Sequence, residues 1–155
     1  MRRSPCRRTG RGWTTSPSWA WRALKEPLPR AEYLLQLGGV KLATDDGGAR
    51  SGGVAAPPAL LMEILELREA LGEARAAGDD AKVARMGAAM GERAAQAMQR
   101  VAEGLAGTPG PEALEAVARE LVALRYFRRF LDEVTAHDEA REARDDAGKE
   151  GTSHG

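Results

Sequence analysis

The residue types that most often carry chemistry are sparse in this chain of 155 residues. It contains two histidines, His137 and His154, and one cysteine, Cys6. Metal sites bring such residues together at short spacings, and these three lie far apart in the sequence. There is also no glycine-rich phosphate loop, no nucleophile elbow and no acid/base pair in an apolar segment. The sequence therefore predicts no catalytic, cofactor-binding or metal site, and we do not expect an enzyme.

A row of carboxylates is the other group of side chains that could carry chemistry. Met62, Glu66, Glu69 and Glu73 recur at intervals of four, three and four residues, which places them on one face of a helix. The apolar stripe of the same segment, which we expect to be buried, consists of Leu60, Ile64, Leu67 and Leu71. Leu61 and Leu65 lie roughly 90–130° from the centre of that stripe at 100° per residue.

Two interpretations of this face remain open. It is either a broad apolar stripe with a solvated charged flank, or a partner-binding surface that is apolar at its centre and acidic at its edge. Tyr126 and Phe130 pose a similar choice, because they lie on a different side of their own helical segment from its leucine stripe. They either extend the exposed patch or cover the open end of the bundle.

Three long helical segments position these residues, at about 58–77, 80–105 and 111–136. Pro58, Asp79 and Pro111 are start signals, and Gly78 follows the end of the first segment. Short turns join the segments, so they predict an all-α fold whose C-terminal part is an antiparallel three-helix bundle. The other two core stripes are Val83, Met86, Met90, Ala94, Ala97 and Val101, and Leu114, Val117, Leu121, Leu124 and Leu131. Gly87 and Gly91 either allow close helix approach or are simply tolerated.

The rest of the chain is less regular. Within 18–37 we expect a short helix over Ser18–Lys25 and a second helix that begins at Pro29 and stops at Gly38. We divide the chain into a disordered arginine-rich segment (1–17), short helices (18–37), a glycine-rich linker (38–57), a three-helix domain (58–137) and a charged tail (138–155).

Composition narrows the class of protein and its possible partners further. The 23 basic and 23 acidic residues cancel, yet residues 1–30 hold eight basic residues and one acidic residue. Neither nucleic acid nor a membrane is expected as the main partner. The single cysteine excludes an internal disulfide and fits a reducing compartment, and the abundance of arginine, alanine and glycine suggests a bacterial source. We therefore expect a cytoplasmic bacterial protein.

Three runs of residues together resemble a known family. They are WRALKEPLPRAEYLL at 21–35, LMEILELRE at 61–69 and LRYFRRFL at 124–131. The first is similar to the junction between the J-domain and the C-terminal domain of HscB-type iron–sulfur cluster co-chaperones. The second and third resemble the start and the last helix of that family's C-terminal three-helix domain. The resemblance covers about residues 19–137, and it identifies residues 18–37 as a remnant of a J-domain.

The resemblance implies a function in protein binding. In the family, the C-terminal bundle holds an IscU-type scaffold protein, and the J-domain acts on a DnaK-type chaperone (HscA) by stimulating its ATPase. The scaffold contacts map onto residues that the helical geometry had already set apart: Leu61, Met62, Leu65, Glu66, Glu69, Glu73 and Tyr126. No cofactor is implied. The alternative is a structural helical adaptor or dimerisation module that uses the same patch on itself.

One family feature is missing from this sequence. J-domain action depends on a His-Pro-Asp tripeptide, whereas His137 is followed by Asp138 and His154 by Gly155. This argues against direct stimulation of a chaperone ATPase by this chain. One hypothesis explains the missing tripeptide: residues 1–17 are translated from a wrong frame or start, and the J-domain is encoded upstream.

Overall fold

The computed structural model describes residues 27–43 and 52–151. These residues form four helices: α2 (Pro27–Leu37), α3 (Pro58–Ala76), α4 (Asp80–Gly104) and α5 (Pro111–Gly151). The predicted all-α class is confirmed. The predictions of disorder over 1–17 and of a helix over Ser18–Lys25 lie outside the described residues, as do much of the linker and the last residues of the tail.

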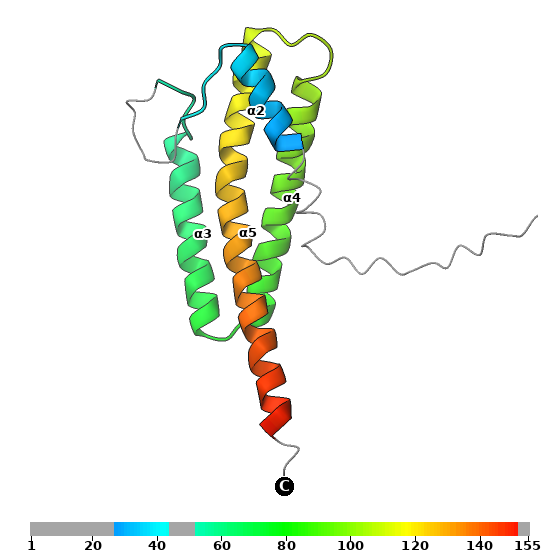
Figure 1. The fold of residues 1–155 in the computed structure, drawn as a ribbon. Helices are drawn as coiled ribbons and strands as arrows, with labels where there is room; N and C mark the ends of the chain where they lie inside the picture. The colour runs from blue at the N-terminus through cyan, green and yellow to red at the C-terminus, as the bar shows by residue number, and fades with distance from the viewer. Residues whose placement is uncertain (1–26, 44–51, 152–155) are drawn as a thin grey trace, which may run out of the picture.

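Helices α3, α4 and α5 form the bundle, and α2 lies across its upper end (Figure 1). The chain reverses between α3 and α4 and again between α4 and α5, so α3 and α5 run in the same direction. α5 packs most extensively against α4 and also contacts α3 and α2. It is therefore the central helix, with neighbours on most of its circumference.

Local sequence signals explain where the helices begin and end. Pro57 precedes α3 and Pro58 opens it, where the missing N–H of proline is tolerated. The helix is followed by Gly78 in the left-handed conformation, at φ 68°. The Asp79 side chain caps α4 by accepting a hydrogen bond from the backbone N–H of Lys82 at 2.9 Å. The predicted bounds of α3 and α4 agree with the structure to within one residue.

The core agrees with the predicted stripes, with one correction. Most of the predicted core residues are buried, and Leu60, Leu67, Met86 and Leu131 are partly buried against them. Phe130 is only 1% exposed, so it does not extend an exposed patch. The reason is that α5 has three neighbouring helices, which makes its buried face much wider than a single stripe.

α5 is also longer than the sequence suggested. The sequence predicts that it ends at about residue 136, but it continues as far as Gly151, a total of 41 residues. Most residues beyond Ala136 are good helix formers, and the Arg144 side chain donates to the carbonyl of Ala140 at 3.1 Å. In Figure 1 the end of α5 therefore projects past the other helices.

The described ends of the glycine-rich linker lie side by side. Leu42 and Val54 form an isolated β-bridge. The N–H of Ala43 donates to the carbonyl of Val54 at 2.9 Å, and the N–H of Val54 donates to the carbonyl of Lys41 at 2.8 Å. These bonds bring the chain back to the bundle and set the point at which α3 begins.

The structure shows that Gly87 and Gly91, whose roles the sequence left open, have different surroundings. A Cβ added at Gly87 would lie 2.9 Å from Cγ1 of Val134 on α5, whereas a Cβ added at Gly91 would meet nothing within 4 Å. Gly87 therefore permits close approach of α4 and α5, and Gly91 does not serve that purpose.

This difference predicts opposite results for two matched variants. Gly91→Ala should raise the free energy of unfolding by up to about 1 kcal/mol, because alanine is the better helix former. Gly87→Ala should gain less or lose stability, because Val134 must shift to admit the methyl group. Urea unfolding followed by circular dichroism measures both. Equal gains for the two variants would contradict the packing role of Gly87.

Candidate partner-binding surface

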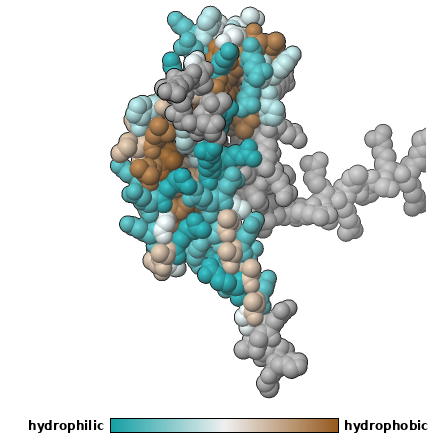
Figure 2. Space-filling view, turned by 60° about the vertical axis from the view of Figure 1, so that its left-hand side comes forward, coloured by the Kyte–Doolittle hydropathy of each residue, from teal (hydrophilic) through white to brown (hydrophobic). Residues whose placement is uncertain are grey.

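The outer face of α3 carries three exposed hydrophobic side chains. Leu61 is 41% exposed, Met62 59% and Leu65 52%. Figure 2, in which the side of the molecule that bears α3 comes forward, shows hydrophobic surface bordered by hydrophilic surface on this side. Large apolar side chains gathered at one end of a helix are a common feature of protein-binding surfaces. We call Leu61, Met62 and Leu65 the apolar patch.

The carboxylate row continues from the apolar patch along α3. Glu66, Glu69 and Glu73 are all exposed. Within the described ranges, 27–43 and 52–151, none of the three has an ion pair or a side-chain hydrogen bond. Their negative charge is therefore not neutralised by the bundle, and it is available to basic groups of a partner.

A neighbouring carboxylate on α3 is used differently. Both oxygens of Glu63 accept hydrogen bonds from the Arg93 guanidinium of α4, at 2.8 and 2.9 Å. The hydrogen bond from Arg93 holds the pKa of the Glu63 carboxyl below its usual range. The same guanidinium lies 5.0 Å from the ring centroid of Phe127 on α5. Arg93 thus connects three helices at the level of the apolar patch.

A second ion pair sets the register between α3 and α5. Arg68 of α3 pairs with Glu133 of α5. Seven residues make nearly two helical turns. Because α3 and α5 are parallel, the residues seven positions before Arg68 and Glu133, which are Leu61 and Tyr126, also lie at the same level as each other. The contacts of Arg93 with Glu63 and Phe127 give nearly the same register.

Tyr126 therefore lies at the level of Leu61, on the side of α5 that faces α3. It is half-buried and packs against the core. The structure thus brings the predicted aromatic residue to the same end of the bundle as the apolar patch, with the carboxylate row leading away from it. Exposure and placement agree with the helical geometry, whereas a binding role for these seven residues stays a prediction.

Sequence reasoning missed the residues that hold α3 in place. Arg93, Arg68 and Glu133 were not singled out, because ion pairs between helices join residues 30 or more positions apart. No local spacing signals such a pair. These residues do not form the exposed face, but they fix how α3 presents it.

His137, which directly follows the predicted end of the third helical segment, is a structural residue. It is 7% exposed, and its Nε2 lies 2.9 Å from Oδ1 of Asp80 at the start of α4. Arg141 lies on the same carboxylate, with Nη1 at 3.7 Å from Oδ2. The described residues contain no group of three or more His, Cys, Asp or Glu side chains that could hold a metal ion.

These contacts predict a pH effect on stability. The hydrogen bond with His137 lowers the pKa of the Asp80 carboxyl from its usual 3.8. Asp80 therefore stabilises the fold above its unfolded pKa, and this contribution is lost as the pH falls through the lower folded pKa. Asp80→Asn should be less stable than the wild type at pH 7 and should approach it in acid. Urea unfolding at a series of pH values checks this, and a difference that persists unchanged in acid would contradict it.

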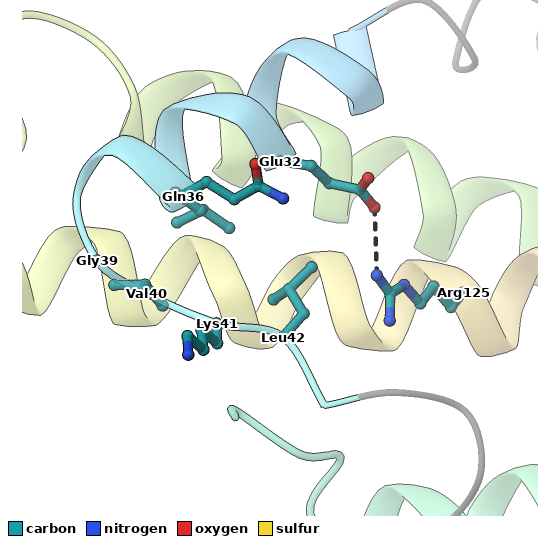
Figure 3. Close-up of a pocket in the computed structure, with 8 residues that line it drawn as sticks. Glu32, Gln36, Gly39, Val40, Lys41, Leu42 and Arg125 are labelled. Carbon is teal, nitrogen blue, oxygen red and sulfur yellow. Dashed lines mark hydrogen bonds and ion pairs between the residues drawn. The ribbon is translucent and has the colours of Figure 1, made fainter. Parts of the chain in front are cut away.

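A cavity of about 520 Å³ lies where α2 meets α5 (Figure 3). Two of its charged groups, Glu32 and Arg125, bond to one another. The Arg125 guanidinium pairs with Glu32 at 3.3 Å and donates to the carbonyl of Ala43 at 3.0 Å. Because these contacts fasten α2 and the linker to α5, we interpret the cavity as part of the structural contact between these segments.

Comparison with known proteins identifies the bundle. The family model described as the HSCB C-terminal oligomerisation domain matches residues 56–135, which is just over half of the chain. The chain belongs to the HscB family. The matched range contains α3, α4 and the part of α5 that packs in the bundle, so the predicted surface lies within the family domain. The resemblance of the sequence to the C-terminal domain of this family is confirmed.

Curated relatives of this HscB-family chain carry the name "Co-chaperone protein HscB homolog". The relative from Ralstonia nicotianae is 44% identical over 73 residues, which are 47% of this chain and 38% of the relative. The relative from Azoarcus sp. is 48% identical over 67 residues, or 43% of this chain and 34% of the relative. The matches thus span little more than a third of each relative. No solved structure gives a significant match.

None of the described helices is long and apolar enough to cross a membrane.

Proposed function

We propose that this chain is a co-chaperone of iron–sulfur cluster assembly that binds an IscU-type scaffold protein through the outer face of α3. The observation that carries the proposal is the apolar patch, Leu61, Met62 and Leu65, exposed beside three carboxylates that have no ion pair within the described part of the chain. Membership of the HscB family and the names of the relatives support the same assignment. The proposed role is non-enzymatic and would be exercised in a bacterial cytoplasm.

The arrangement suggests how binding would work. Burial of the apolar patch would supply most of the affinity, because water leaves its large side chains. The carboxylate row would attract basic groups of the scaffold, orient the encounter and make association depend on salt. Tyr126 would border the patch from α5, and the ion pairs of Arg93 and Arg68 would keep α3 at a fixed distance from it.

A charge reversal tests the assignment of the surface. Glu69→Lys should weaken scaffold binding by at least about 1 kcal/mol, because a negative charge that attracts basic groups of the scaffold is replaced by a positive charge that repels them. Glu92→Lys is the matched control, because Glu92 is exposed on α4 and lies outside the proposed surface. Titration calorimetry against the scaffold measures both variants. Equal affinities for Glu69→Lys and the wild type, with helicity intact, would refute the assigned face.

Coupling to a DnaK-type chaperone such as HscA is the second part of the family role. The printed sequence holds no His-Pro-Asp tripeptide, so we propose that this chain holds the scaffold without itself stimulating the chaperone ATPase. An ATPase assay with the cognate chaperone, with and without scaffold, tests this. Stimulation by the chain alone would contradict it.

The alternative function is a helical adaptor or dimerisation module that pairs the apolar patch on itself. The description of the matching family model as an oligomerisation domain favours some form of assembly. Sedimentation of the chain separates the two functions, because self-association without scaffold binding would support the alternative.

A further inference from the structure

A second apolar feature lies on the other flank of α3, in the groove between α3 and α4. The groove has a volume of about 230 Å³. Its apolar lining includes Leu67 of α3, Met86 and Met90 of α4, and Phe130 of α5. Leu67 and Met86 are only partly buried and Ala89, which also lines the groove, is exposed, so these side chains are accessible from outside, whereas Met90 and Phe130 are only 2% and 1% exposed. The α3–α4 groove is thus separate from the apolar patch.

The rim of the α3–α4 groove is basic. Lys82, Arg85 and Arg93 of α4 line it. Arg93 is engaged by Glu63, but the side chains of Lys82 and Arg85 have no ion pair within residues 27–43 and 52–151. This is unusual in a region where acidic residues outnumber basic ones, with 19 against 13 over residues 58–155. The groove is suited to an occupant that is apolar and negatively charged.

The chain itself carries a surface of that kind. The apolar patch and the carboxylate row follow one another along α3, and Met62 and Glu73 are eleven residues apart. Lys82 and Arg93, which mark the ends of the groove on α4, are also eleven residues apart. At about 1.5 Å per residue, both features extend about 16 Å. The two surfaces therefore match in length as well as in polarity and charge.

Symmetric pairing of two α3 faces fits less well. A parallel pair would set the carboxylate rows against each other, and like charges in contact disfavour a complex. An antiparallel pair would place each carboxylate row against the apolar patch of the other copy, which would remove charge from water without a partner. A contact between the α3 face and the groove avoids both costs.

We propose that the α3–α4 groove binds the outer face of α3 from a second copy of this chain. The carboxylates of one copy pair with Lys82 and Arg85 of the other, while its apolar patch covers Met86 and Ala89. The contact is heterologous, so it joins copies head to tail. Because it uses the face proposed for the scaffold, a bound scaffold and a bound second copy exclude each other on that face.

Sedimentation velocity of the full chain over a concentration series tests the proposal. The wild type should show a sedimentation coefficient that rises with concentration and falls again with added salt. The double variant Lys82→Glu/Arg85→Glu and the double variant Glu69→Lys/Glu73→Lys should each sediment as a monomer. Each keeps the surface that the other has lost, so an equimolar mixture should associate. The matched control, Arg119→Glu/Arg144→Glu on α5, should behave as the wild type.

A wild type that stays monomeric at every concentration overturns the proposal. So does a mixture of the two variants that fails to associate while both retain wild-type helicity. Scaffold titration of Lys82→Glu/Arg85→Glu is run in parallel and distinguishes the two proposals. A failure of scaffold binding in both this variant and the wild type contradicts the proposed function alone, because the groove contact does not need the scaffold.

Discussion

Replacement of Phe130 with alanine is expected to lower the free energy of unfolding by about 3–5 kcal/mol. Phe130 is 1% exposed and is among the largest fully buried side chains described. It lies on α5, where α3, α4 and α5 meet at the floor of the α3–α4 groove. Truncation removes the apolar contact area of the ring and leaves a cavity that the neighbouring helices cannot fill.

Urea unfolding followed by circular dichroism measures this loss. Leu131→Ala is the matched control, because Leu131 is the next residue along α5 but is only partly buried, so its loss should be smaller. If Phe130→Ala is too unstable to measure, Phe130→Leu should still show a reduced midpoint, because leucine fills only part of the space. A loss below that of Leu131→Ala would show that Phe130 is not a core residue.

Leu65→Ala is expected to weaken scaffold binding at least fivefold, equivalent to about 1 kcal/mol or more. Leu65 is 52% exposed, so its truncation should leave the stability of the bundle nearly unchanged. The loss arises because Leu65 lies between the rest of the apolar patch and the carboxylate row. A partner that covers both must remove this side chain from water.

The control for Leu65→Ala is the same change at a comparable exposed position. Leu37 is 68% exposed at the end of α2, away from the outer face of α3. Leu37→Ala should therefore leave the affinity for the scaffold unchanged. Titration calorimetry gives both dissociation constants, and similar losses for the two variants would contradict the assignment of the α3 face.

The fold could be predicted from the sequence where local signals act. Prolines at the first turns of α3 and α5 and the cap at Asp79 define the helix starts. Heptad-like apolar spacing then indicates which faces are buried. Spacing also set the apolar patch apart from the stripe at Leu60, Ile64, Leu67 and Leu71, although it left open whether the patch is a binding surface or part of a broad apolar stripe.

The remaining features depend on tertiary contacts that the sequence does not display. Phe130 is buried because α5 is surrounded, and a pattern read on one helix cannot reveal how many neighbours it has. His137 is buried because Asp80, 57 residues away, reaches it from the start of α4. The α3–α4 groove likewise combines side chains of three helices, so its apolar floor and basic rim are visible only in the assembled bundle.

The parallel register of α3 and α5 has a consequence for inhibitors of this surface. A synthetic peptide with the sequence of α3 would contain six of the seven predicted contact residues, but it would lack Tyr126, which is supplied by another helix 50 positions further along the chain. Alone in water, a peptide of 19 residues with a glycine at position 72 would hold its helix only weakly. Competition for the scaffold would therefore require a miniature protein that reproduces both helices, rather than a single excised segment.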